Sequence, residues 1–191
     1  MQRLGLFGGS FDPIHLGHLL VAQAAREELG LTRLFFIPAA HSPFKPDLQP
    51  TPGADRVRLM RLALAEADWC EIDELELQRG GVSYTIDTLR DYSRRFPGAE
   101  LVYLVGADNV PHLPKWRDSA ELARLARFAA IPRPGQAEAA FPPPFHGQTL
   151  TACPFGVSSS QIRERVKQGL SIEHLVPRNV QEAIRNYRLY L

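Results

Sequence analysis

Cysteine is scarce in this sequence of 191 residues, which has two, Cys70 and Cys153. They stand far apart and form no CxxC or Cys/His cluster, so a disulfide-rich scaffold and a cysteine-based metal site are excluded. A reduced, cytoplasmic protein is the simplest interpretation of this cysteine usage.

Long apolar runs are also missing. No stretch approaches the ~18 consecutive apolar residues that a membrane-spanning helix needs. The first residues, MQRLGLFGGSFDP, reach Gly and Asp too early to be a signal peptide. We therefore expect no membrane partner.

An excess of charge of one sign is the third absence. The formal net charge is +1, so the chain offers no overall basic field to a nucleic-acid backbone, and we expect no nucleic-acid partner. Any anion must be bound by a local site. The sequence is compatible with a homo-oligomer and does not fix the oligomeric state.

Short apolar runs alternate along the chain with helical patterns. Strands are expected at residues 4–7, 34–37, 69–72, 101–105 and 127–131, and helices at 16–29, 54–66, 85–96, 118–126, 158–168 and 178–188. Such alternation is typical of right-handed βαβ units, and apolar, non-alternating strands fit a sheet covered on both faces. We predict one domain over residues 1–191, with a Rossmann-like, doubly wound α/β fold and a parallel sheet of five or six strands.

Two proline-rich segments, 43–53 and 132–144, interrupt this pattern. They are either surface linkers or borders of a site, because loops at the carboxyl ends of parallel strands often hold ligands.

The segment GGSFDPIHLGH, residues 8–18, lies between the first expected strand and the first helix. Free backbone N–H groups and the helix dipole favour an anion at such a junction, and glycines let a phosphate approach closely. His15 and His18 are three residues apart, so both can face one side of the helix start, with Gly17 leaving room between them. Two imidazoles and several free N–H groups predict a phosphate cradle.

A second candidate phosphate site is VSSSQIR, residues 157–163. Ser158 is a plausible N-cap, and Ser159 and Ser160 add hydroxyls at a helix start. Arg163, one turn later, can offer a forked donor to a terminal phosphate.

These motifs resemble the signatures of the cytidylyltransferase-like nucleotidyltransferases: [HT]xGH near the N-terminus and ISSTxIR, which binds the ATP triphosphate, near the C-terminus. Four further segments resemble those of the nicotinate-nucleotide adenylyltransferases within that superfamily. They are SYTIDTL at residues 83–89, GAD at 106–108, LPKW at 113–116 and RPG at 133–135. Their order and spacing hold from about residue 4 to residue 188.

The resemblance implies transfer of AMP from ATP to nicotinate mononucleotide, giving deamido-NAD and pyrophosphate in NAD biosynthesis. It implies catalytic roles for His15 and His18. The residues expected to bind ATP are Gly8, Gly9, Ser10, Phe11, His15, His18, Lys45, Gly106, Asp108, Arg133, Ser158, Ser159 and Arg163. Those expected to bind the pyridine nucleotide are Ser83, Tyr84, Thr85 and Trp116. No carboxylate cluster is visible, so we expect no metal ligand in the chain and Mg²⁺ held mainly by ATP phosphates and water.

The sequence departs from the family pattern at two places. Phe44 stands before Lys45 where relatives often have a histidine, so only Lys45 is carried over. Arg117 follows Trp116 where an aromatic residue is common, which leaves the second wall of the pyridine pocket undefined.

Three alternatives differ in class. A related adenylyltransferase acting on nicotinamide mononucleotide or phosphopantetheine would share both phosphate motifs; the segments SYTIDTL and LPKW favour a pyridine nucleotide. A regulatory module without turnover would have no need for both histidines and Arg163. An aminoacyl-tRNA synthetase fragment shares an HIGH-like motif, but the chain is short, near neutral and has no KMSK-type loop.

Overall fold

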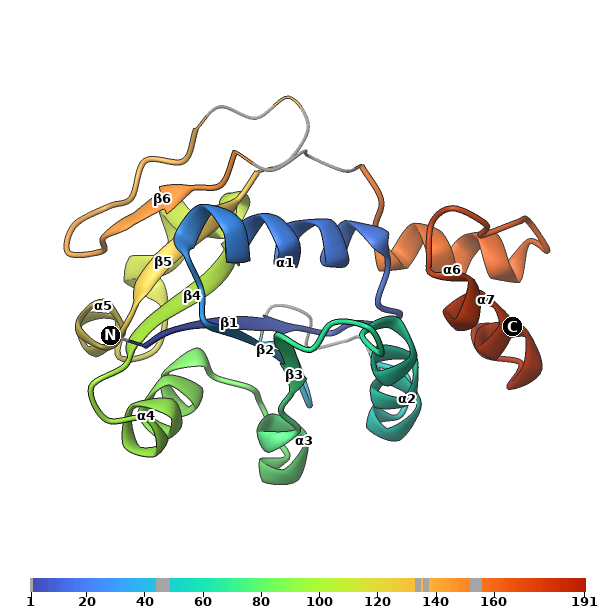
Figure 1. The fold of residues 1–191 in the computed structure, drawn as a ribbon, viewed down its shortest axis with the longest axis horizontal. Coiled ribbons are helices and arrows are strands. Elements are labelled where there is room, and N and C mark those ends of the chain that lie inside the picture. The colour runs from blue at the N-terminus through green and yellow to red at the C-terminus, as the bar shows by residue number, and fades with distance from the viewer. Residues whose placement is uncertain (1, 44–48, 133–134, 136–137, 152–155) are drawn as a thin grey trace.

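The computed structural model describes residues 2–43, 49–132, 135, 138–151 and 156–191. Its centre is a six-stranded sheet with the order β3-β2-β1-β4-β5-β6, in which every neighbouring pair is parallel (Figure 1). The strands are β1 (Arg3–Gly9), β2 (Arg33–Pro38), β3 (Cys70–Ile72), β4 (Glu100–Gly106), β5 (Arg127–Ile131) and β6 (Gly147–Thr149).

Helices cover both faces of this sheet, with α1 along one face and α4 on the other (Figure 1). The helices are α1 (Leu16–Leu29), α2 (Gly53–Ala63), α3 (Leu75–Arg79), α4 (Thr85–Arg95), α5 (Ser119–Leu125), α6 (Ser159–Lys167) and α7 (Arg178–Asn186), with a 3₁₀ helix η1 (Ala107–Lys115). The chain runs outward from β1 to β3 and then returns to place β4 on the other side of β1. In such sheets ligands bind beyond the carboxyl ends of the strands at this switch point.

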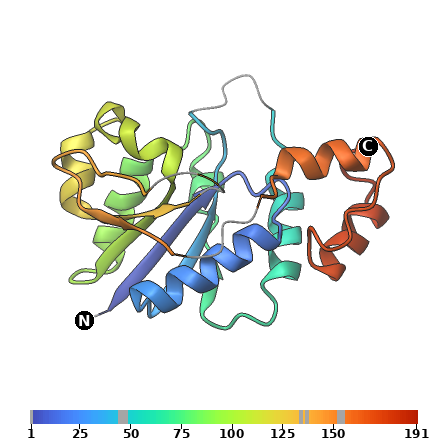
Figure 2. The same ribbon diagram turned by 90° about the horizontal axis from the view of Figure 1, so that it is seen from above.

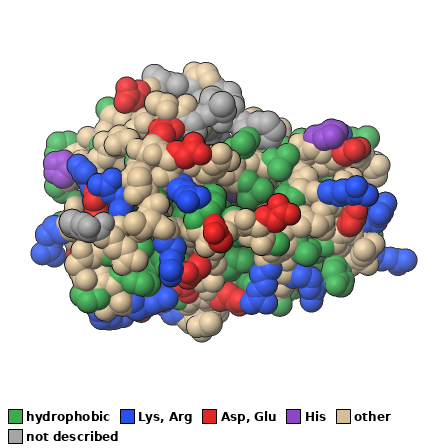
Figure 3. Space-filling view, in the orientation of Figure 1, with side chains coloured by type: hydrophobic (Ala, Val, Ile, Leu, Met, Phe, Trp, Pro, Cys, Tyr) green, Lys and Arg blue, Asp and Glu red, His purple; other side chains and the backbone are tan. Residues whose placement is uncertain are grey.

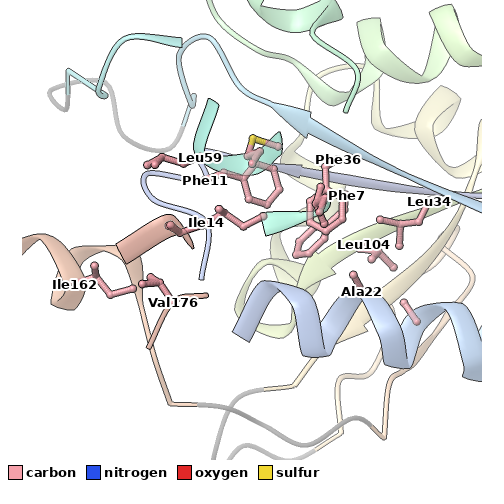
Figure 4. Packing of buried hydrophobic residues seen from close by; sticks show 14 of the residues in the cluster. Phe7, Phe11, Ile14, Ala22, Leu34, Phe36, Leu59, Leu104, Ile162 and Val176 are labelled. Carbon is pink, nitrogen blue, oxygen red and sulfur yellow. The ribbon is translucent and has the colours of Figure 1, made fainter. Parts of the chain in front are cut away.

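One hydrophobic cluster joins the sheet to the C-terminal helices. Phe7, Phe11 and Phe36 pack with ring centroids 5.4 Å apart, and Ile162 of α6 and Val176 belong to the same cluster (Figure 4). α6 and α7 lie beyond the end of the sheet that is farther from the N-terminus (Figures 1 and 2). Because Ile162 is fully buried, the start of α6 is held against the loop that leaves β1.

The predicted fold class is confirmed, as are all five predicted strands and all six predicted helices, with bounds shifted by up to three residues. Three elements were missed. α3 has five residues and β6 three, too few to show a period, and η1 contains Pro111 and Pro114, which mask its helical character.

Charges of both signs are mixed on the face seen in Figure 3, where basic and acidic side chains alternate over short distances. Among the described residues, no helix is both long and apolar enough to cross a membrane.

Candidate active site

The first helix start holds two histidines in contact. His15 is the N-cap of α1 and His18 lies one turn later, and their rings stack with centroids 3.6 Å apart. A Cβ on Gly17 would lie 3.1 Å from the His15 ring, so glycine leaves the space that this pair occupies. The structure therefore brings His15 and His18 together on one side of the helix start.

A backbone hydrogen bond selects the tautomer of His18. The His15 N–H donates to His18 Nδ1 over 3.2 Å, so Nδ1 is the acceptor and a neutral His18 carries its proton on Nε2. Burial lowers the pKa of His15 to about 4. Burial, and then the neighbouring His15, lower the pKa of His18 well below its usual value. At neutral pH this pair is uncharged and offers N–H donors.

Two backbone donors at this helix start are already engaged. The Leu16 N–H donates to the Leu175 carbonyl over 3.0 Å, and the His15 N–H is used by His18. Leu175 comes from the segment before α7, so the sequence around α1 gives no sign of this bond. The two imidazoles therefore supply a larger share of the donors at this helix start.

Phe11 packs into the core beside the histidine pair. The residue is 1% exposed, and its ring lies 5.0 Å from the His18 ring, centroid to centroid. The ring holds the His18 imidazole from the core side, together with Phe7 at 5.9 Å.

The second helix start is capped as predicted. The Gln161 N–H donates to Ser158 Oγ over 3.3 Å, and the Ser158 N–H donates to Gln161 Oε1 over 2.9 Å. This reciprocal pair fixes where α6 begins. It also engages the Ser158 hydroxyl in the cap of the helix.

Two bonds join the start of α6 to the loop after β1. Ser159 Oγ donates to the Pro13 carbonyl over 2.9 Å, and Arg163 Nη1 donates to the Asp12 carbonyl over 2.7 Å. Val157 lies 3.4 Å from the position of a Gly17 Cβ. The two predicted phosphate sites therefore adjoin each other, although they are far apart in the sequence.

A buried arginine holds the loops around this region. Arg56 of α2 is 1% exposed and donates to three carbonyls, those of Ser10 (2.6 Å), Thr51 (2.9 Å) and Ala39 (2.9 Å). Ser10 follows β1 and Ala39 follows β2, so one guanidinium fixes the exits of two neighbouring strands. Arg56 was not predicted as a site residue, because a helical pattern does not show which charged side chain is buried.

We expect Arg56→Met to lower the free energy of unfolding by about 3 kcal/mol or more, because three carbonyls of half-buried residues lose a charged donor. Arg58→Met is the matched control: Arg58 lies on the same helix, is exposed, and its ion pair with Asp55 is worth under about 1 kcal/mol. Urea unfolding curves measure both. Equal losses in the two variants would contradict the role given to Arg56.

A cavity of about 270 Å³ opens at the carboxyl ends of β1 and β4. Four predicted segments meet in its lining, which includes Gly8, Gly9, Ser10, Ser83, Tyr84, Thr85, Gly106, Lys115, Trp116 and Arg117. A Cβ on Gly8 would come within 2.5 Å of the Tyr103 hydroxyl. Glycine at this position therefore keeps the cavity open beside β1.

The start of α4 forms one wall of the cavity. Its N-cap is Tyr84, and no side chain of the described residues caps it. The Thr85 hydroxyl contacts the Tyr103 hydroxyl at 3.4 Å, and the edge of Trp116 meets the Tyr103 ring at 6.4 Å. The Arg117 guanidinium lies 4.8 Å above the Tyr84 ring. Arg117 and Tyr84 thus form one part of the cavity wall.

A buried carboxylate also reaches this cavity. Glu76 of α3 is 5% exposed and lies in the lining with Ser83. Burial raises the pKa of Glu76, against hydrogen bonds from Thr88 and Ser83 that lower it. Neither Glu76 nor α3, the short helix to which it belongs, was predicted from the sequence.

The other predicted residues fall as follows. Asp108 is half-buried at the start of η1, between the lining residues Gly106 and Asn109. Lys45 and Arg133 lie outside the described residues. Pro43 belongs to the lining, so the first proline-rich segment borders the cavity.

Comparison with known proteins defines the class. The sequence model of the cytidylyltransferase-like family matches residues 6–165, and the chain belongs to this family of nucleotidyltransferases. Relatives narrow it further: the chain is 43% identical to a probable nicotinate-nucleotide adenylyltransferase of Thermus thermophilus, over 99% of this chain and 100% of the relative. It is 41% identical to a probable nicotinate-nucleotide adenylyltransferase of Opitutus terrae, over 99% of this chain and 98% of the relative. The nicotinate-nucleotide adenylyltransferases are thus its group within the family.

Solved structures support the fold. A Plasmodium falciparum nicotinic acid mononucleotide adenylyltransferase complexed with NaAD superposes with a TM-score of 0.81 at 17% identity, over 100% of this chain and 98% of that one. The structure of the same enzyme complexed with APC superposes with a TM-score of 0.80 at 17% identity, over 100% of this chain and 98% of that one.

Proposed function

We propose that this protein transfers the AMP part of ATP to nicotinate mononucleotide, giving deamido-NAD and pyrophosphate in NAD biosynthesis. One observation carries the proposal: two helix starts suited to phosphates meet at the loop after β1, and the same stretch, at Gly8 to Ser10, lines a cavity walled by aromatic rings and the start of α4. The names of its full-length relatives agree with this chemistry.

The reaction is an in-line displacement at phosphorus. A phosphate oxygen of the mononucleotide forms a bond to the α-phosphorus of ATP while the bond to the bridging oxygen breaks, and pyrophosphate leaves with that electron pair. No covalent intermediate with the chain is needed. The protein contributes by holding the two nucleotides in line and by stabilising charge on the phosphate oxygens.

The first helix start and α6 bind the phosphates in this proposal. His18 Nε2–H and His15 donate to the phosphate oxygens where charge builds. Ser159 and Arg163 hold the triphosphate, and Lys45 adds a cation. The backbone of Gly8 to Phe11 lies along the nucleotide. Ser158 contributes as the N-cap of α6, the helix whose start binds phosphate.

The remaining residues orient the two nucleosides. Asp108, after β4, is placed to bind the ATP ribose, with Gly106 and Arg133 beside the adenosine. The N–H groups at the start of α4, with the Thr85 hydroxyl nearby, bind the nicotinate carboxylate; Tyr84 lines the same wall, and Trp116 packs against the pyridine ring.

Magnesium belongs to the proposal as an ion that arrives with ATP. Within the described ranges, His, Cys, Asp and Glu side chains form no group of three or more that could hold a metal. Phosphate oxygens and water would therefore supply most of its ligands. We also propose a cytoplasmic location, where ATP is available.

A pyrophosphate-release assay tests the proposed function. The protein is given ATP with nicotinate mononucleotide, nicotinamide mononucleotide or phosphopantetheine as acceptor. The proposal expects the fastest release with nicotinate mononucleotide and deamido-NAD as the product. Release only with phosphopantetheine would reassign the protein to a sister transferase, and no release with any acceptor would favour a binding module.

We expect Arg163→Lys to raise the KM for ATP about tenfold with little change in the KM for the acceptor, because a point charge replaces a planar fork. Arg165→Lys is the matched control, since Arg165 lies on the same helix and bonds to the Ser171 carbonyl. Initial rates over a range of ATP concentrations measure the effect. An unchanged KM for ATP in the first variant would make α6 a structural element only.

A further inference from the structure

Glu76 lies beneath the wall of the cavity where α4 begins. α3 brings its carboxyl to a position that is 5% exposed, in the same lining as Ser83 and Thr85. Burying a carboxylate is costly unless hydrogen bonds compensate it. Residues that carry such a cost beside a binding cavity are candidates for a functional role.

Two hydroxyls stabilise this carboxyl. Thr88 Oγ1 of α4 donates to Glu76 Oε1 over 2.5 Å, and hydrogen bonding with the hydroxyl of Ser83, in the same cavity lining, lowers the pKa of the carboxyl. Ser83 Oγ in turn accepts the Ala40 N–H over 2.9 Å. Glu76 is therefore the end of a chain of hydrogen bonds that runs to the loop after β2.

This chain fixes the direction of the Ser83 hydroxyl. Ser83 and Thr85 flank the N-cap of α4 and carry the hydroxyls nearest to its first N–H groups. Ser83 is engaged by Glu76 and Ala40, and Thr85 by Tyr103. Neither hydroxyl caps α4 in the described structure. Because the Tyr84 N–H donates to the Val82 carbonyl over 3.1 Å, the N–H groups that α4 can offer to the cavity are those of Thr85 and Ile86.

We propose that Glu76 is a positioning residue for acceptor specificity: by holding the Ser83 hydroxyl, it keeps the start of α4 open for the carboxylate of a pyridine mononucleotide. This inference rests on the proposed function and extends it to a residue that does not touch the reacting atoms. A carboxylate suits the task because it accepts from both hydroxyls and donates to neither. An amide in its place would direct an NH₂ donor toward one of them.

The test compares Glu76→Gln with Glu74→Gln. Glu74 precedes the same helix and pairs with Arg61 near the surface, so its variant is the matched control. We expect Glu76→Gln to raise the KM for nicotinate mononucleotide about tenfold, the effect of one lost bond to a charged group. The KM for ATP and kcat should change less than about threefold, and Glu74→Gln should match the wild type.

A double-mutant cycle shows whether Glu76 acts through Ser83. Ser83→Ala is expected to raise the acceptor KM by a similar factor, and adding Glu76→Gln to it should cost little more. If Glu76→Gln does not fold, as judged by circular dichroism, Glu76→Asp, which keeps the charge and shortens the side chain, is expected to raise the KM for the acceptor and not the KM for ATP.

The outcomes separate this inference from the proposed function. Wild-type protein that does not use nicotinate mononucleotide overturns both. Wild-type turnover with an unchanged acceptor KM in folded Glu76→Gln and Ser83→Ala overturns the inference alone. Equal rises in the KM values for ATP and acceptor, or additive effects in the double variant, would also overturn it, because they indicate a general structural role.

Discussion

His18→Ala is expected to lower kcat by roughly 10²–10³ while the protein stays folded. The His18 ring is held by Phe11 and Phe7 on one side and by the stacked His15 ring on another. Its Nδ1 accepts from the His15 backbone, which leaves the Nε2–H as a donor of fixed direction. A donor held in this way needs no reorganisation when charge builds on a phosphate oxygen.

Two amide variants test which nitrogen matters. In His18→Gln the side-chain NH₂ can reach the place of Nε2, whereas in His18→Asn it reaches only the place of Nδ1. We expect Gln to retain more activity than Asn. His174→Ala, which removes an exposed histidine, is the control and should behave as wild type. Pyrophosphate release under saturating substrates measures all four proteins, and near wild-type turnover by folded His18→Ala would refute the assignment.

The fold could be predicted where local signals are long. The bounds of α1 agree with the prediction at both ends because its apolar spacing lasts 14 residues and Gly30 ends it in a left-handed conformation. α3 has five residues, and no periodic signal fits into so few. From the sequence, Glu76 is therefore indistinguishable from an ordinary surface charge, and only the tertiary structure shows that its side chain is buried.

The candidate site could be predicted as two helix starts but not as one assembly. Ser158 as N-cap follows from local residue types. The bond from Ser159 to the Pro13 carbonyl spans 146 residues, and it depends on how Ile162 seats α6 in the core. The same kind of distant contact, from the Leu16 N–H to the Leu175 carbonyl, engages one N–H group at the start of α1 and could not be predicted from the neighbouring residues.

The second large effect concerns acceptor choice: we expect nicotinate mononucleotide to be preferred over nicotinamide mononucleotide by at least roughly 10²-fold in kcat/KM. The two acceptors differ in one group on the pyridine ring, which is a carboxylate in nicotinate mononucleotide and an amide in nicotinamide mononucleotide. N–H groups at the start of α4 can donate to both oxygens of the carboxylate. The amide would turn an NH₂ donor toward one of them, and a donor that faces a donor in a closed pocket costs about 1–3 kcal/mol, more where a charged partner is lost.

The surrounding groups favour the same choice. The Arg117 guanidinium, over the Tyr84 ring, adds positive charge at the cavity wall. The Glu76 carboxyl could serve an amide NH₂ as acceptor, but it already accepts from Thr88 and Ser83. Competition between the two acceptors at fixed ATP measures the ratio, with Arg117→Gln expected to reduce it. Equal use of both acceptors by the wild type would mean that an acceptor group, with Glu76 the nearest candidate, faces the pyridine substituent directly. The specificity would then be that of a general pyridine-nucleotide adenylyltransferase.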